Sequence, residues 1–466
     1  MDDFFQHRDT QSENQSDRKG STLVADKPAE MFIRCCKLLV FSVSLCLCVT
    51  PVMVDRSYAA DVRTLTLEQA LAIAVEQNRD IAKAGEYGRY VKGKYVEERS
   101  AALPQLGLAA SAVIRRDDGQ PSFAGGGSNQ YDNYLGVSLS QPLYTWGKIG
   151  AAIRAAEIGM NTAKEQLRLA QQAARRDVTA VFYDVLLARE LVRLSAENLQ
   201  QKQRHSEEAH RKFDAGVATD YDVLSADVAL ENARPAKFKA ENMLRLSRER
   251  LRFLLALDEE VDADGRLEPT VTPPPSYNEV LQAALANRPE LIDLGYRIGV
   301  YGELVTIAAA DDKPRFDLKG GTGWHQLEMM DSSNDGAVWN VGIYLSFPFF
   351  DGMKTSGRVE QARSDLATRE IDKLKLQDSI RLEARTALNN LQESAEILTA
   401  LAGTVKQAER LLQMAEKGYE FGVKIRLEVD DAQTNLLQAQ INRARAATDY
   451  LTAWVNLEWV MGRLGE

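Results

Sequence analysis

Apolar and polar residues alternate strictly in two stretches of the chain. In YLGVSLSQPL (134–143), Leu135, Val137 and Leu139 fall on one side and small or polar residues on the other. VWNVGIYLSFPFF (338–350) alternates in the same way. A period of two predicts a β-strand with one apolar and one polar face. Together with a shorter partner that follows a proline in each case, the pattern predicts four strands, at 104–115, 132–143, 314–325 and 338–349.

Long stretches with helical composition surround these strands. The segments 147–212 and 352–417 contain no proline and are rich in Ala, Leu, Glu, Gln and Arg. Each is followed by a glycine turn and a second helical segment, 220–256 or 426–463. A helix of roughly 65 residues reaches nearly 100 Å and has no core of its own, so it must pack against other helices.

The chain repeats itself after about two hundred residues. FDAGVATDYDVLSADVALENA (213–233) corresponds to YEFGVKIRLEVDDAQTNLLQA (419–439), and SQPLYTWG (140–147) corresponds to SFPFFDG (346–352). Because the features recur in one order with nearly constant offset, they predict a single unit used twice. The expected boundaries are a first repeat at 60–256, a linker rich in Pro, Asp and Gly at 257–276, and a second repeat at 277–464.

Residues 1–59 form a leader rather than part of the fold. From Met31 the chain has a basic head, a short apolar run (38–49) and small residues before Ala60. This order predicts a secretory signal peptide at 31–59, removed after Ala59 or Ala60, and the run is too short for a membrane-spanning helix. A retained anchor is the alternative. All four cysteines lie in the leader, so the exported chain must be stabilised by packing or assembly rather than by disulfides.

Composition and charge exclude several function classes. The chain has 466 residues and a net charge of −10, which disfavours nucleic acid as a partner. No nucleotide loop, nucleophile motif or metal-ligand cluster occurs, so we expect no cofactor, no metal and no enzymatic activity. His205 and His210 are five residues apart, off a common helix face, and are expected to be solvated.

Four strands cannot close a barrel, because they leave two open edges, and open edges do not survive in lipid. An apolar outer face with aromatic residues near the strand ends is typical of a transmembrane barrel. More than one chain must then complete it. Two copies give a barrel of eight strands, and side chains fill the interior of a barrel of that size. Three copies give twelve strands, which leave an open pore. A soluble four-stranded sheet packed on the helices is the alternative.

The duplicated order, the LxxALxxAxxxN-like opening helix (67–78), the stretch QPLYTWGK (141–148) and the paired glycine turns resemble the TolC-type outer-membrane efflux proteins. The resemblance covers about 62–464. It implies a mainly α fold with a small β part, in which a long α-helical barrel continues a 12-stranded transmembrane β-barrel made by a homotrimer. It also implies an outer-membrane channel-tunnel of a tripartite efflux or type I secretion system. The partners would be a periplasmic adaptor, an inner-membrane transporter and outer-membrane lipid. The alternative is a periplasmic coiled-coil adaptor or scaffold without a pore.

Acidic residues follow both glycine turns. By resemblance, the turns lie at the periplasmic mouth, where Asp222, Glu428 and Asp431 would narrow the pore and favour cations. Lys424 and Arg426 would pair with these acids and hold the mouth shut.

Helix capping is the other explanation for these acids. Thr219 and Asp222 form a T-x-x-D capping pattern, whereas the second copy has Ile425 in place of the threonine. Capping therefore accounts for Asp222 as well as a pore role does, but less well for Glu428 and Asp431. The turns themselves are expected to be the tips that meet an adaptor, and a plain glycine C-cap is compatible with that role. The tip residues are Gly216, Val217, Gly422 and Val423.

Overall fold

The computed structural model describes residues 63–117, 128–329 and 332–465. The expected leader at 1–59 lies outside these residues, as do residues 118–127 and 330–331 between the predicted strands. No helix in the described part is both long and apolar enough to cross a membrane.

Each repeat begins with two shorter helices and a strand pair. The first repeat has β1 (Arg63–Leu65), α2 (Leu67–Gln77), α3 (Arg79–Ser100), β2 (Gln105–Asp117) and β3 (Ser128–Tyr144). The linker contains β4 (Val261–Ala263), and the second repeat has α6 (Tyr277–Asn287), α7 (Pro289–Ala309), β5 (Arg315–Met329) and β6 (Ser332–Ser346). β1 and β4 pair in parallel and join the start of the first repeat to the linker.

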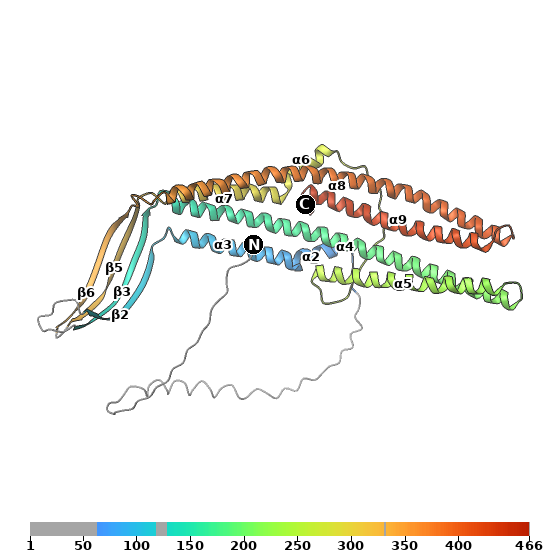
Figure 1. Ribbon diagram of the computed structural model, residues 1–466, viewed down its shortest axis with the longest axis horizontal. Helices are drawn as coiled ribbons and strands as arrows, with labels where there is room; N and C mark the ends of the chain where they lie inside the picture. Colours follow the sequence, from blue (N-terminus) through green and yellow to red (C-terminus); the bar gives the residue numbers. More distant parts are fainter. Residues whose placement is uncertain (1–62, 118–127, 330–331, 466) are drawn as a thin grey trace, which may run out of the picture. The chain divides into compact units, whose positions relative to one another are not determined.

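Two long helical hairpins complete the repeats. α4 (Lys148–Asp214) returns as α5 (Asp220–Leu255), and α8 (Lys354–Glu420) returns as α9 (Arg426–Val460). α4 and α8 have 67 residues each, which corresponds to a length of about 100 Å. In Figure 1 the strands lie at one end of these helices and the hairpin turns at the other.

The four longer strands form one antiparallel sheet in the order β2-β3-β5-β6. β3 and β5 belong to different repeats, so the two hairpins join into a single sheet with free edges at β2 and β6. β6 starts before the predicted 338, because residues 332–337 still pair with β5 through their backbone although their side chains do not alternate. It ends at Ser346 rather than 349, since Pro348 has no N–H to donate.

The sheet has one apolar and one polar face, as the alternation predicts. Trp339, Val341 and Ile343 on one face are 79%, 70% and 68% exposed. The other face consists largely of glycine, serine and polar side chains, and Gly136 pairs there with Gly323. An exposed apolar face of this size requires a partner, which for a sheet is lipid or another protein layer.

The helices form a layer with different neighbours along its length. Near the sheet the order is α3-α4-α7-α8, and near the hairpin turns it is α5-α4-α9-α8. α4 is therefore central throughout, whereas α3 and α5 lie at one border of the layer and α8 lies at the other.

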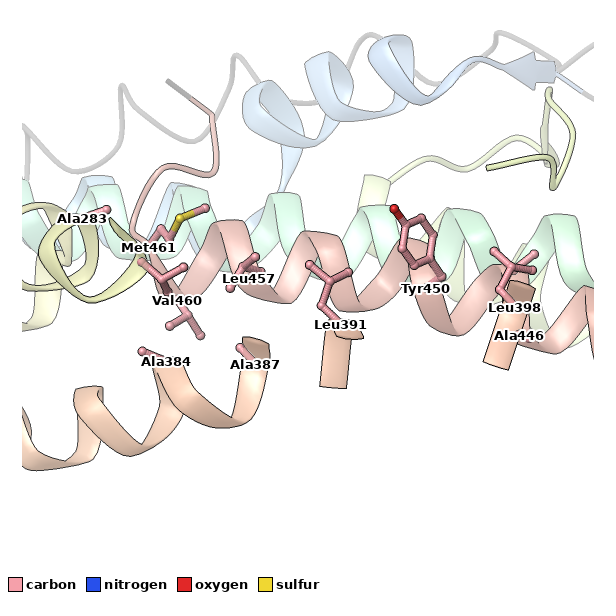
Figure 2. Packing of buried hydrophobic residues seen from close by; sticks show 12 residues of the cluster. Ala283, Ala384, Ala387, Leu391, Leu398, Ala446, Tyr450, Leu457, Val460 and Met461 are labelled. Atoms are coloured by element: carbon pink, nitrogen blue, oxygen red, sulfur yellow. The ribbon is translucent and has the colours of Figure 1, made fainter. Parts of the chain in front are cut away.

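Each repeat has its own core midway along the hairpins. In the first repeat, Val185 of α4 and Leu251 of α5 are fully buried together with α2, β1 and β4. Their counterparts in the second repeat, Leu391 and Leu457, are buried between α8, α9 and α6 (Figure 2). Tyr450 of α9 is also buried, and its hydroxyl accepts a hydrogen bond of 2.9 Å from the backbone N–H of Thr272, which ties the linker to the second core.

Candidate functional site

Both hairpin turns close with the same backbone geometry. Gly216 and Gly422 adopt left-handed conformations, with φ of 74° and 72°. The N–H of Val217 donates to Lys212 O, and that of Val423 donates to Gly418 O, so each turn satisfies the last carbonyls of the preceding helix. Val217 and Val423 are 74% and 80% exposed. The four predicted tip residues thus form two equivalent, exposed apolar tips.

Asp222 caps the start of α5. Its Oδ2 accepts hydrogen bonds from the Thr219 N–H at 2.8 Å and the Thr219 hydroxyl at 2.7 Å. These backbone and side-chain hydrogen bonds lower the pKa of Asp222, so the carboxylate is ionised at neutral pH. The capping explanation accounts for these contacts.

Glu428 has a similar role at the start of α9, which the absence of a threonine at 425 concealed. Its Oε2 accepts a hydrogen bond of 3.1 Å from the Ile425 N–H, and its other oxygen pairs with Lys424. The Lys424 hydrogen bond, followed by the Ile425 N–H, lowers the pKa of Glu428. The predicted pairing of Lys424 with an acid is therefore present, but within one turn. Asp431 is exposed on the following turn.

Arg426 does not pair with Glu428 or Asp431, contrary to expectation. Its guanidinium lies 3.7 Å from the Glu208 carboxylate of α4 and 3.5 Å from that of Asp430. Asp430 is four residues after Arg426 and faces it on the helix, whereas Asp431 is five residues on and points away. Arg426 thus connects the two repeats.

Asp430 is the residue that sequence reasoning missed. Its Oδ1 is 3.1 Å from Lys202 Nζ and 3.6 Å from His205 Nδ1, both on α4. Partial burial alone would raise the pKa of Asp430, but the nearby His205, Lys202 and Arg426 outweigh it and lower the pKa well below its usual value. The side chain of His205 is only 18% exposed, so the expectation that it is solvated is wrong. The one signal in the sequence was that Arg426 and Asp430 are four residues apart, which places them on the same face of a helix.

A second contact joins the repeats closer to the turns. Lys212 of α4 donates a hydrogen bond of 3.0 Å to the hydroxyl of Tyr419 on α8, and it also pairs with Glu208 at 2.7 Å. We call the whole set the inter-repeat bridge. Its members are Lys202, His205, Glu208, Lys212, Tyr419, Arg426 and Asp430.

Within the described residues, no group of three or more His, Cys, Asp or Glu side chains is arranged to hold a metal ion. The hairpin ends combine exposed apolar tips, ionised acids and cross-repeat ion pairs. Such an arrangement is suited to partner docking and ion passage rather than to catalysis.

The duplicated helical hairpins and the two-faced sheet assign the chain to a class of outer-membrane channel proteins. The model of the outer membrane efflux protein family matches residues 70–257 and again 280–463. The chain belongs to this family. It is an outer-membrane channel-tunnel of efflux and secretion systems and not an enzyme.

Known relatives agree with this assignment. The chain is 27% identical to the alkaline protease secretion protein AprF of Pseudomonas aeruginosa, over 72% of this chain and 71% of AprF. It is 25% identical to the outer membrane protein TolC of Vibrio cholerae, over 79% and 84% of the two chains. The fold is similar to the solved Campylobacter jejuni CmeC outer membrane channel, with a TM-score of 0.76, 18% identity and 85% coverage of both chains. The family match and these sequence relatives exclude the alternative of an adaptor or scaffold without a pore.

Proposed function

We propose that three copies of the chain form one conduit across the outer membrane and the periplasm. The proposal is supported by the sheet, whose edges β2 and β6 are both free. β6 of one copy would pair with β2 of the next, which removes every open edge. Three copies give twelve strands and an open lumen, whereas side chains fill a barrel of eight.

The helices favour the same order of copies. The exposed apolar side chains Phe238 and Phe253 lie on α5, at one border of the helix layer, and Ile371 and Leu374 lie on α8, at the other. α3 leads into β2, so α3 and β2 lie at the same border of the chain. β6 leads into α8, so these two lie at the opposite border. At each border the free strand and the helices next to it would therefore contact the same neighbouring copy. This contact is head-to-tail, and such contacts form a closed ring when the rotation from one copy to the next closes.

At the end remote from the sheet, the six hairpins of a trimer would surround the mouth of the conduit. Asp222, Glu428 and Asp431 of three copies would place nine carboxylates near that mouth. Asp431 is the one of these three residues that has no capping role. Rings of carboxylates select cations. The pore role and the capping role are compatible, because a capping carboxylate keeps its charge.

The hairpin tips are the proposed contact for partners. Gly216 with Val217, and Gly422 with Val423, expose small and apolar surface that a helical hairpin of a periplasmic adaptor could pack against. The adaptor would connect the conduit to an inner-membrane transporter, and outer-membrane lipid would cover the apolar face of the sheet. Export would depend on the signal peptide at 31–59.

The single observation behind this function is a sheet with two free edges and one exposed apolar face. The test is to purify the protein in detergent, measure its mass by light scattering and record currents in a planar bilayer. We expect a trimer that conducts ions without an energy source. A monodisperse single chain that remains soluble in plain buffer would refute the proposal.

A further inference from the structure

A cavity of about 990 Å³ lies where the helices meet the sheet. α4 provides its floor, and α3 and α7 provide its two walls. The floor consists of small residues, among them Ala152, Ala156 and Gly159, which leave a slot between the walls. All of these elements belong to one chain. A neighbouring copy would pack against the far side of α3, so ring closure would leave the cavity open.

The cavity opens on the polar face of the sheet. Gln105 and Ser140 line it and are paired across β2 and β3. They lie two residues from Gly107 and Ser138, which belong to the polar face. Arg315 and Ser346, a pair across β5 and β6, line it as well. If the apolar face meets lipid, as the proposed function requires, the cavity opens into the lumen.

Aromatic rings cover the walls and the rim. Tyr87 and Tyr90 of α3 are stacked with their centroids 6.2 Å apart, and Tyr90 is 68% exposed. Tyr301 of α7 lies on the opposite wall. Trp146 is fixed at the rim because its Nε1 donates a hydrogen bond of 2.6 Å to Pro314 O. The three exposed rings, Tyr87, Tyr90 and Trp146, beside a floor of small residues favour a flat aromatic guest, because offset stacking stabilises such pairs by about 1 kcal/mol each.

The charged residues of the cavity are already paired with opposite charges. Lys148 lies 2.5 Å from Asp311, and Arg297 lies 2.8 Å from Asp293. Lys94 is 3.1 Å from Glu98, Lys313 is 3.3 Å from Asp312, and Arg315 is 2.8 Å from Asp317. A charged guest would have to break one of these pairs without a free countercharge to receive it.

We propose that this cavity is a lumenal binding site for planar aromatic solutes without net charge, which occupy it during passage. The inference rests on the proposed function, since it requires the polar face to line the conduit. It assigns a substrate class to the channel: small aromatic compounds are among its cargo. Binding is weak, because a conduit must release what it holds.

The absence of cysteine after residue 48 allows a direct test. Ala156→Cys places one thiol on the cavity floor. Trimers in lipid nanodiscs are alkylated with N-ethylmaleimide, with and without 1-naphthol, and the rate is followed by mass spectrometry. We expect 1-naphthol at twice its dissociation constant to slow alkylation about threefold, since one third of the sites remain free. Wild-type protein gives the background, and Ala152→Cys is the second site if the first variant does not assemble.

Matched controls distinguish the cavity from general partitioning. Ser138→Cys lies on the polar face outside the cavity, and 1-naphthol should not protect it. Tyr90→Ala combined with Tyr301→Ala should abolish protection at position 156, whereas Tyr90→Phe should retain it. 1-Naphthalenesulfonate, 1-naphthylmethylammonium and decahydro-1-naphthol should protect poorly, because the first two are charged and the third is not aromatic.

Unslowed alkylation, equal protection at Ser138→Cys, or equal protection by the charged compounds would overturn the inference. Bilayer conductance of the same preparations distinguishes failure of the proposed aromatic site from failure of the proposed channel. Normal conductance without protection refutes the aromatic site and leaves the channel intact, whereas loss of conductance in wild-type protein refutes the channel itself.

Discussion

Arg426 and Glu208 belong to different repeats, yet their side chains lie 3.7 Å apart near the hairpin ends. Arg426 also contacts Asp430, which in turn contacts Lys202 of α4. Ion pairs therefore connect the second hairpin to the first near the turns. Contacts of this kind can open without exposing a core.

Removing Arg426 should loosen this connection. For Arg426→Ala we expect a higher mean single-channel conductance, because the second hairpin loses a link to α4 whose strength is on the order of 1 kcal/mol. The measurement is conductance in a planar bilayer, and Arg410→Ala, at an exposed position on α8, is the matched control. If both variants conduct like wild type, the inter-repeat bridge does not restrain the mouth.

Asp430 should make stability depend on pH in a defined direction. Its pKa is lowered in the folded protein, despite partial burial, by His205, Lys202 and Arg426. A carboxyl with a lowered pKa stabilises the fold above its unfolded value of 3.8, and that contribution is lost as pH falls through the folded value. We expect Asp430→Asn to destabilise the protein at pH 7 by roughly 1 kcal/mol, a figure reduced for solvent screening because the carboxylate is partly exposed.

The measurement is thermal unfolding of wild type and Asp430→Asn from pH 7 to pH 3. The difference between them should shrink as the pH falls below about 4. A difference that grows below pH 4 would contradict the assigned direction.

Much of the fold follows from local patterns, but the bridge does not. Alternation at Val137 and Val341 predicts strands, and the glycines at 216 and 422 predict turns, because each depends on a few neighbouring residues. The pairing of β3 with β5 and the approach of Arg426 to Glu208 bring together residues far apart in sequence. Tertiary packing of α4 against α9 brings Arg426 close to Glu208. The spacing of residues along the sequence does not predict this contact.

The acids at the mouth should determine ion preference. Glu428→Gln combined with Asp431→Asn removes six charges from a trimer and should reduce the cation-to-anion permeability ratio by roughly threefold to tenfold at low salt. Reversal potentials in a KCl gradient measure this ratio. Glu370→Gln, at an exposed acid near the other end of α8, is the control. An unchanged ratio would leave Glu428 as a helix cap and Asp431 as a surface residue.

On the polar face of the sheet, the ring of Tyr134 lies over Gly136. A Cβ on Gly136 would lie 2.2 Å from the Tyr134 hydroxyl oxygen and 2.9 Å from Thr322 O, so the absence of a side chain there creates the space for the ring. Gly136→Ala should turn three rings into the lumen of a trimer and lower its conductance. If the ring is the obstacle, adding Tyr134→Ala should restore the conductance, whereas a distorted strand would stay impaired in the double variant. Single-channel currents of the two single variants and the double variant decide between these causes, and Gly336→Ala, where a Cβ meets nothing within 4 Å, controls for added bulk on the same face.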